Sequence, residues 1–543
     1  MQLAKWGREP RALETIRRTF FGRIPPRARE VFMSFESFAR DPRTLVALAF
    51  ALLAGCGGST PGGTFANDNN GGGGGTSTNG GSSAPSLGGA SGGGGLAGDA
   101  SAGPCTGLAC QVHSCAGGSS TSISGTVLDP AGKNPLYNIA VYVPNSTPQP
   151  MPAGVTCDCS ALYTGDPIAS ALTDAAGHFS ITGVPDGANI PLVIQVGKWR
   201  MQTKVASVTA CQDNPQPGGQ LRLPKNHTEG DIPNMAISTG SADSLECLLH
   251  RIGLDDTEYG PGSSGAGHIH IFQGGGTPQS VSPPPPSPIP IPIPIPGGPG
   301  FALGGAPNTS PAAPASSQAL WDTKGDLLKY DMVLLSCEGQ ETTAMTQQSL
   351  FDYAAAGGRV FASHFHYAWF NTGPFGAANL ASWTTGSNDM GTINAKIDTS
   401  FPKGAALDQW LGNVGALSGG ELPIQQARHN ADVSASNTAS QAWIAADQSA
   451  KPARATEYFT FNTPIGAPAA QQCGRVVYSD LHVGAASGDY ATSTSSPIVP
   501  TGCASNKLSP QEAALEFMLF DLSACVISDG QPPTPPPPVA APR

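Results

Sequence analysis

Charged residues are scarce in this sequence, and basic clusters are scarcer. Only 12% of the 543 residues are Asp, Glu, Lys or Arg, and the formal net charge is −11. The one basic cluster lies before residue 44, in a segment that we expect to be removed. Because contacts with phosphate need clustered Lys and Arg, the composition excludes a nucleic-acid partner.

The N-terminal apolar stretch is shorter than the run of about 20 residues that a membrane-spanning helix needs. It covers residues 44–55, reads TLVALAFALLAG, and follows Arg40 and Arg43. This length and this flank are typical of the apolar core of a signal peptide. We therefore predict a leader over residues 1–55. A start at Met33 would give a leader of ordinary length, and a long leader from Met1 is the alternative.

The stretch ends in Leu53-Ala54-Gly55-Cys56, which resembles the lipobox of bacterial lipoproteins. The resemblance implies that the Cys56 sulfur is acylated, that Cys56 becomes the new N-terminus, and that membrane lipid is a partner. No Asp follows the cysteine, which in that family favours the outer membrane over the inner one. A plain secretory signal with an incidental cysteine is the alternative. Both interpretations imply export.

Glycine and proline are abundant, with 69 and 51 residues, and much of this excess lies in tracts that cannot pack. Residues 56–104 form a Gly-rich tether that we expect to behave as a random coil. A Pro-rich insertion covers residues 277–318, and its PPPPSPIPIPIPIP run must be polyproline II. Residues 526–543 form a Pro-rich tail that we expect to be disordered.

Cysteine spacing of the C-x-x-C kind, which many zinc sites use, is missing. The chain has twelve cysteines, and eleven remain without Cys56. Exported proteins pair their cysteines, so disulfides are expected, with zinc binding as the alternative. Cys503 and Cys525 bracket a C-terminal helix and could be linked. Six more could close three disulfides, in 15 possible ways: Cys105, Cys110, Cys115, Cys157, Cys159 and Cys211.

Short strand patterns separated by turn residues fill residues 105–228, which predicts a small β-sandwich. The order of pieces resembles a carboxypeptidase regulatory-like domain. The matching pieces are Gly125 to Gly132, Pro135 to Val143, Thr173 to Ile181 and Val184 to Gly187. The resemblance implies an Ig-like, non-catalytic module that acts in folding or spacing or contacts carbohydrate or protein. An insert around Cys157-Asp158-Cys159 departs from the family pattern.

Residues 229–525 alternate strand and helix patterns, which predicts an α/β domain with a parallel, flavodoxin-like sheet. The order resembles the class I glutamine-amidotransferase-like fold and, within it, the ThuA-like group. The matching pieces are Tyr330 to Leu335, Tyr353 to Val360 and Gly474 to Ser479. The resemblance covers about half of the domain and supports the fold better than it supports an activity.

Polar residues follow three of the predicted strands. Because sites in open parallel sheets lie at the carboxyl ends of the strands, we expect these residues to share one crevice. The candidate residues are Cys337, Glu338, His364, His366, Asp480 and His482.

An amidotransferase needs a cysteine nucleophile at a sharp strand-to-helix turn, and the comparable turn here carries His364, as in ThuA-like proteins. Glutaminase chemistry is therefore not expected, and no catalytic residue is assigned. Cys337 could be a displaced nucleophile with His364 or His366 as its base, half of a disulfide, or unpaired. His364, His366 and His482, with Asp480, could instead hold a metal. The third interpretation is a crevice whose histidines only form local hydrogen bonds, with no cofactor.

Two functions from different classes remain. The first is a lipid-anchored envelope protein with a non-catalytic binding or structural role, in contact with cell-surface carbohydrate or protein. The second is a carbohydrate-active or hydrolytic enzyme that uses the crevice of His364, His366 and His482. The missing elbow cysteine favours the first.

Overall fold

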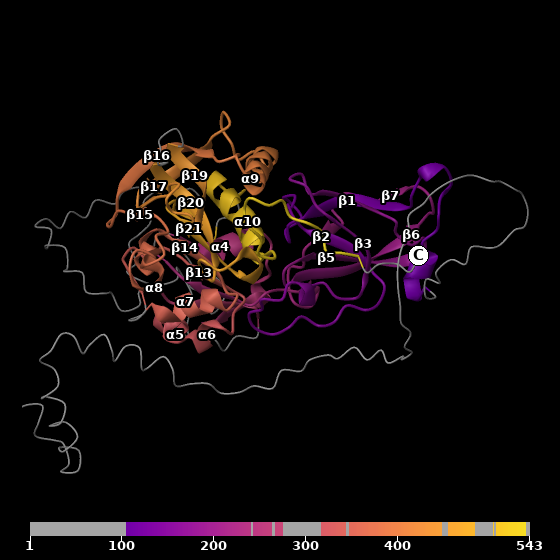
Figure 1. Ribbon diagram of the computed structural model, residues 1–543, viewed down its shortest axis with the longest axis horizontal. Coiled ribbons are helices and arrows are strands. Elements are labelled where there is room, and N and C mark those ends of the chain that lie inside the picture. Colours follow the sequence, from indigo (N-terminus) through magenta and orange to yellow (C-terminus); the bar gives the residue numbers. More distant parts are fainter. Residues whose placement is uncertain are drawn as a thin grey trace, which may run out of the picture. The chain divides into compact units, whose positions relative to one another are not determined.

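The computed structural model describes residues 105–240, 243–262, 267–274, 316–343, 347–447, 454–483, 503 and 507–538. All of them belong to one compact unit, Leu96–Arg543. The predicted leader, Cys56, the tether and nearly all of the Pro-rich insertion lie outside the described residues. Figure 1 shows that the described part is rich in β-sheet, with few helices.

Two sheets are built from the N-terminal part. One has the order β4-β1-β7 with β8 also paired to β1, and the other has the order β3-β2-β5-β6-β9. Alternating apolar residues such as Ile123, Val141 and Ile194 point into a shared core. The strands are β1 (Ser122–Leu128), β2 (Ala140–Pro144), β3 (Pro167–Leu172), β4 (His178–Thr182), β5 (Gly187–Val196), β6 (Trp199–Val208), β7 (Asp213–Pro215), β8 (Leu221–Arg222) and β9 (Gly230–Asp231).

The C-terminal part is built on a ten-stranded mixed sheet with the order β11-β12-β10-β13-β14-β21-β20-β19-β16-β17. The first six strands are parallel, and the last four extend the sheet in antiparallel fashion. The parallel strands are β10 (Met235–Ser238), β11 (Tyr259–Pro261), β12 (Ile269–Phe272), β13 (Met332–Leu335), β14 (Arg359–Ser363) and β21 (Gly474–Ser479). The antiparallel strands are β16 (Asp389–Ile397), β17 (Leu422–Arg428), β19 (Ser440–Asp447) and β20 (Arg454–Thr463). The prediction of a parallel sheet is therefore correct for six strands and wrong for the four antiparallel ones.

A separate two-stranded sheet pairs β15 (Ser382–Trp383) with β18 (Ala431–Asp432). Most of the helices in the described residues are short. They are α4 (Leu245–Arg251), α5 (Ser317–Trp321), α6 (Lys324–Leu327), α7 (Gln348–Ala355), α8 (Gly373–Gly376), α9 (Pro402–Asn413) and α10 (Pro510–Ser523). In the described residues, no helix combines the length and the apolar character needed to cross a membrane.

Helix α10 joins the two parts through its buried surface. It begins with a capping box between Ser509 and Glu512, and Gln511 to Leu522 are all buried. Phe517 stacks on Tyr137, and Phe520 packs against Trp199, both from the N-terminal part. Most of its buried residues are apolar, and its buried acids have partners, with Glu512 paired to Arg251 and Glu516 bonded to Asn134.

Five disulfides form, and two of them connect the N-terminal part to the C-terminal part. These two are Cys157–Cys473 and Cys159–Cys525, which start from the segment around residue 158. The predicted Cys503–Cys525 link is wrong, because Cys503 pairs with Cys247 on α4. Cys105–Cys110 and Cys115–Cys211 complete the set. Among the described cysteines, only Cys337 is free.

Part of the Pro-rich tail is held by buried charges. Asp529 accepts a hydrogen bond from Arg475 at 2.6 Å and lies 4.0 Å from Lys403. Asp521 on α10 pairs with both cations, at 2.9 and 2.7 Å. The two buried carboxylates and the two buried cations balance one another's charge in the interior. They hold Asp529 in place, although the sequence predicts that this segment is disordered.

Candidate functional site

The topology places a switch point at the carboxyl ends of β10 and β13. From β10 the chain continues to β11 and β12 on one side and then crosses to β13 on the other. Just after β10, the backbone of Gly240 packs against the backbone of Cys337, which follows β13. A Cβ at Gly240 would lie 2.1 Å from the Cys337 carbonyl oxygen, so only glycine fits there. In open α/β sheets, this kind of edge is where ligands bind.

Three of the predicted residues meet at this edge. The Cys337 sulfur lies 3.4 Å from Nδ1 of His364, and Nε2 of His482 lies 3.0 Å from the same nitrogen. All three side chains are buried. They come from the ends of three strands, β13, β14 and β21, that are neighbours in the sheet.

His364 adopts a backbone conformation with positive φ that residues other than glycine seldom adopt. Its φ is +42°, at the point where β14 gives way to a short 3₁₀ helix, His364–Trp369. Such a turn points the side chain out of the strand toward the strand ends, as a nucleophile elbow does. The strained residue of the predicted elbow is therefore a histidine.

The other predicted residues point elsewhere. Nε2 of His366 bonds to the Ser336 carbonyl oxygen at 2.9 Å, and the ring packs against Trp321. Glu338 accepts hydrogen bonds from the Ser238 and Thr342 hydroxyls. The predicted trio of His364, His366 and His482 is thus not brought together, and Cys337 stands where His366 was expected.

Asp480 is also occupied. Its Oδ2 accepts from the backbone N–H groups of Asn430 and Ala431, at 2.7 and 2.9 Å, and its Oδ1 accepts from the Tyr478 hydroxyl. Burial raises the pKa of this carboxyl to about 7. Asp480 therefore holds the 430–431 segment against β21 and does not face the three side chains.

Asp243 is a site residue that the sequence pattern does not indicate, because it follows no predicted strand closely enough to stand out. The side chain is buried and ties the strand ends together. It accepts from the backbone N–H of Cys337 at 3.3 Å, from the backbone N–H of Val483 at 2.6 Å, and from the Ser363 hydroxyl. One partner belongs to Cys337 itself, and the other two directly adjoin His364 and His482. Asp243 is a positioning residue for the whole cluster.

The site favours neutral side chains. Burial, and next the charge of Asp243, raises the pKa of the Cys337 thiol to about 12. Burial lowers the pKa of His364 to about 2, with a contribution from His482, and lowers the pKa of His482 to about 3, with one from Arg428. A thiolate–imidazolium pair, which an activated cysteine needs, is therefore disfavoured.

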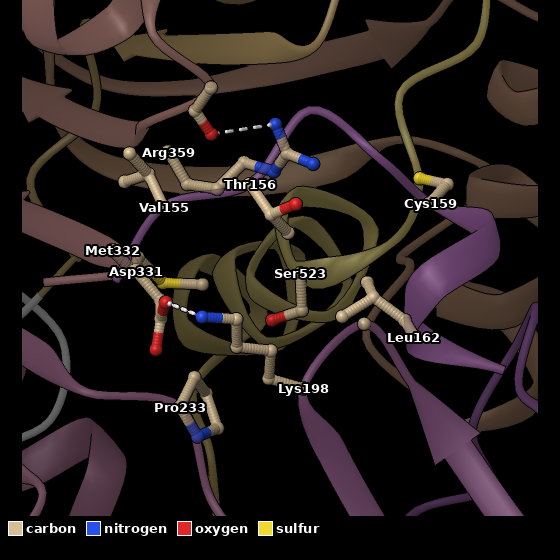
Figure 2. Close-up of a pocket in the computed structure, with 12 residues that line it drawn as sticks. Val155, Thr156, Cys159, Leu162, Lys198, Pro233, Asp331, Met332, Arg359 and Ser523 are labelled. Carbon is tan, nitrogen blue, oxygen red and sulfur yellow. Dashed lines mark hydrogen bonds and ion pairs between the residues drawn. The ribbon is translucent and has the colours of Figure 1, made fainter. Parts of the chain in front are cut away.

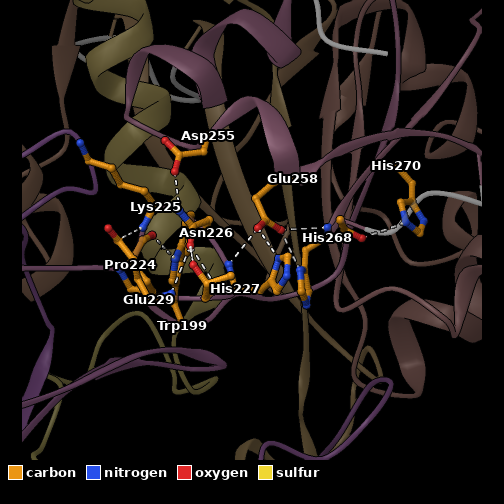
Figure 3. Close-up of polar contacts among 12 residues, drawn as sticks. Trp199, Pro224, Lys225, Asn226, His227, Glu229, Asp255, Glu258, His268 and His270 are labelled. Carbon is orange, nitrogen blue, oxygen red and sulfur yellow. Dashed lines mark hydrogen bonds and ion pairs between the residues drawn. The ribbon is translucent and has the colours of Figure 1, made fainter. Parts of the chain in front are cut away.

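A second cluster joins His227, Glu258 and His268 (Figure 3). The buried Glu258 carboxylate accepts from Nδ1 of both histidines, at 2.6 and 2.8 Å. The same carboxylate also accepts hydrogen bonds from the backbone N–H groups of these two histidines, at 2.8 and 3.1 Å. Burial would raise the pKa of Glu258, but these hydrogen bonds outweigh it and lower the pKa to about 2. Every polar atom that faces inward is thus already paired.

A small cavity of about 40 Å³ lies where the two parts of the unit meet (Figure 2). Its wall includes Lys198, whose ammonium bonds to Asp331 at 2.5 Å, and the disulfide-bonded Cys159. This volume is close to that of one or two water molecules. The cavity is a packing feature, remote from the strand ends that carry His364.

No family model matches the chain, and no curated protein matches it. Among solved structures, two mutant type II cohesin–X-dockerin complexes from Acetivibrio cellulolyticus have TM-scores of 0.15 and 0.13, with 17% and 14% identity. The matched regions cover 25% and 26% of this chain and 85% and 78% of the respective matched chains. A 9R-lipoxygenase from Cyanothece PCC8801 has a TM-score of 0.10 at 15% identity, over 21% of this chain and 18% of its own.

Proposed function

We propose that this chain is an exported, lipid-anchored protein of the bacterial cell envelope with a non-catalytic binding or structural role. Five disulfides support an oxidising compartment, since such bonds persist outside the cytosol. The lipobox-like Leu53-Ala54-Gly55-Cys56 supports acylation at Cys56, with the outer membrane favoured. The flavodoxin-like, ThuA-like assignment of the α/β part and the regulatory-like assignment of the sandwich belong to the same proposal.

The observation that carries the non-catalytic role is the residue at the strand-to-helix turn. His364 occupies the strained position where an amidotransferase has its nucleophilic cysteine. The nearby thiol of Cys337 is fully buried, and its pKa is raised to about 12, so it is not an activated substitute. Binding to envelope carbohydrate or protein is the role that remains for such a scaffold.

Two measurements test this proposal. Mass spectrometry of the mature N-terminus should find an acylated Cys56, and Cys56→Ser should move the protein from the membrane fraction to the soluble fraction. Purified protein should not turn over glutamine, esters or glycosides. Turnover by the wild-type protein that His364→Ala abolishes would overturn the non-catalytic role, and an unmodified mature N-terminus would overturn the anchor.

A hydrolytic enzyme is the second candidate. It is favoured by the meeting of Cys337, His364 and His482 at the switch point, where α/β enzymes place their sites. The same substrate panel distinguishes the two candidates.

A further inference from the structure

We propose that Cys337, His364 and His482 bind a divalent metal ion of the zinc class through Sγ, Nδ1 and Nε2. This site goes beyond the proposed envelope function and does not depend on it. The three donor atoms all lie within 4.8 Å of one another, and all three side chains are buried.

The spacing of the donor atoms fits tetrahedral coordination. Zinc binds imidazole nitrogen at about 2.0–2.1 Å and thiolate sulfur at about 2.3 Å, which places neighbouring donors about 3.3–3.6 Å apart. The two nitrogens are 3.0 Å apart, and the sulfur is 3.4 Å from Nδ1 of His364. These two distances are within a few tenths of an ångström of the expected values, and the third pair, Sγ of Cys337 and Nε2 of His482, lies within 4.8 Å and would close to about 3.6 Å around the ion.

The hydrogen bonds on the far sides of the rings give an independent reason. Nε2 of His364 lies 3.3 Å from the Ser387 carbonyl oxygen, which can only accept, so this nitrogen carries the proton. Nδ1 of His482 lies 3.3 Å from Oε1 of Gln426, also an acceptor. Both neutral rings then present bare lone pairs to each other.

Two lone pairs at 3.0 Å repel each other unless a cation lies between them. Metal-bound histidines usually donate their second N–H to an oxygen, and both rings do so here. In the competing arrangement His482 donates to His364, and the Gln426 amide is reversed so that its NH₂ group faces the ring. That arrangement needs no metal and is the alternative outcome of the experiment below.

The donor set narrows the class of ion. One thiolate and two imidazoles suit zinc and its neighbours among the transition metals, whereas calcium and magnesium prefer oxygen ligands. Binding would release the Cys337 thiol proton, since only the thiolate coordinates. Asp243 fixes the backbone beside each ligand, so the site is held by buried contacts.

Cobalt binding to the exported full chain tests the proposal directly, because Co²⁺ replaces zinc and reports its ligands by absorption. After removal of metal with a chelator, we expect about one equivalent of Co²⁺ to bind per chain. Visible bands of tetrahedral cobalt and a near-ultraviolet thiolate-to-cobalt band should appear. Zn²⁺ should displace the cobalt and abolish both.

Single variants identify the ligands. Cys337→Ser should remove the thiolate band, and His364→Ala and His482→Ala should weaken binding by more than the roughly 10–100-fold that loss of an outer hydrogen-bond partner costs. His366→Gln is the matched control, because it lies two residues from His364 but faces Ser336. Circular dichroism shows which variants fold.

The outcomes are distinct. A folded wild-type protein without cobalt bands would overturn the site, as would bands that persist in Cys337→Ser. Bands that His268→Ala removes would place the metal at the Glu258 cluster instead. None of these results bears on the lipid anchor or on substrate turnover, so the proposed function stands or falls separately.

Discussion

Two clusters in the C-terminal part each contain two histidines, and they use them in opposite ways. Around Glu258, both rings turn their N–H groups inward to a carboxylate that two backbone amides also reach. Around His364, the outer nitrogens of both rings face oxygens, and the inner nitrogens face each other and a sulfur. The first cluster is a completed hydrogen-bond network. In our proposal, a cation completes the second. The direction of the outer hydrogen bonds, more than the proximity of the side chains, distinguishes a metal site from a structural cluster.

The largest expected effect comes from removing the carboxylate of the first cluster. Glu258→Ala leaves four N–H donors without their acceptor, and at about 1 kcal/mol for each lost hydrogen bond the change costs about 4 kcal/mol. Chemical denaturation of metal-free protein should show this loss in the free energy of unfolding. Asp256→Ala is the control, because Asp256 is largely exposed and pairs only with His250. It should change stability by less than about 0.5 kcal/mol.

Zinc should stabilise the folded protein only by binding at the cluster of Cys337, His364 and His482. At a free zinc concentration about 100-fold above Kd, a ligand that binds only the folded state adds about 2.7 kcal/mol. We expect this gain in the wild-type protein and its loss in Cys337→Ser and His482→Ala, measured by denaturation with and without zinc. An equal gain in Cys337→Ser would show that zinc binds elsewhere.

The sequence predicts the strands that carry this site better than it predicts the site itself. The apolar runs at β13, β14 and β21 identify three neighbouring parallel strands, and the residues after them include all three clustered side chains. Strand ends are a reliable signal because parallel strands end at one edge of the sheet. Which side chains then face one another depends on rotamers and on the turn at His364. These are not encoded in the spacing, so His366 was grouped with the site and Asp243 was left out.

The antiparallel half of the sheet and the disulfide pairing were out of reach for another reason. Helix α9 separates β16 from β17, as in a βα unit, but the two strands pair antiparallel. β16 also pairs with β19, where Lys396 lies opposite Ala445, and the local sequence pattern does not encode this contact. Cys157 and Cys473 are 316 residues apart, and cysteine spacing alone cannot select such a pair among many. The insert at Cys157–Cys159 was visible as a departure from the family pattern, but its role as a link to the C-terminal part was not.

Changing the outer partner of His482 should have a smaller effect than removing a ligand. In Gln426→Leu the Nδ1 proton of His482 loses its acceptor, so cobalt affinity should fall by about 10–100-fold while the thiolate band remains. Gln425→Leu is a neighbouring control, because Gln425 meets α10 through its backbone. Unchanged affinity in Gln426→Leu would show that the Gln426 amide does not orient the His482 ring for the metal.

A change of pH also distinguishes the two clusters, with a small effect per pH unit. The pKa of Glu258 is lowered from 4.5 to about 2, so the folded state holds the ionised form more strongly than the unfolded state does. Its contribution to stability is therefore complete above pH 4.5 and is lost as the pH falls toward 2, at no more than about 1.4 kcal/mol per pH unit. In metal-free protein, Glu258→Gln should reduce the slope of unfolding free energy against pH in this window, and Cys337→Ser should leave it unchanged. Glutamine keeps the size of the side chain but has no proton to gain or lose in this range. A slope in Glu258→Gln as steep as that of the wild-type protein would therefore mean that Glu258 is not the group that titrates. The interpretation of the Glu258 cluster as a completed hydrogen-bond network would then lose its main support.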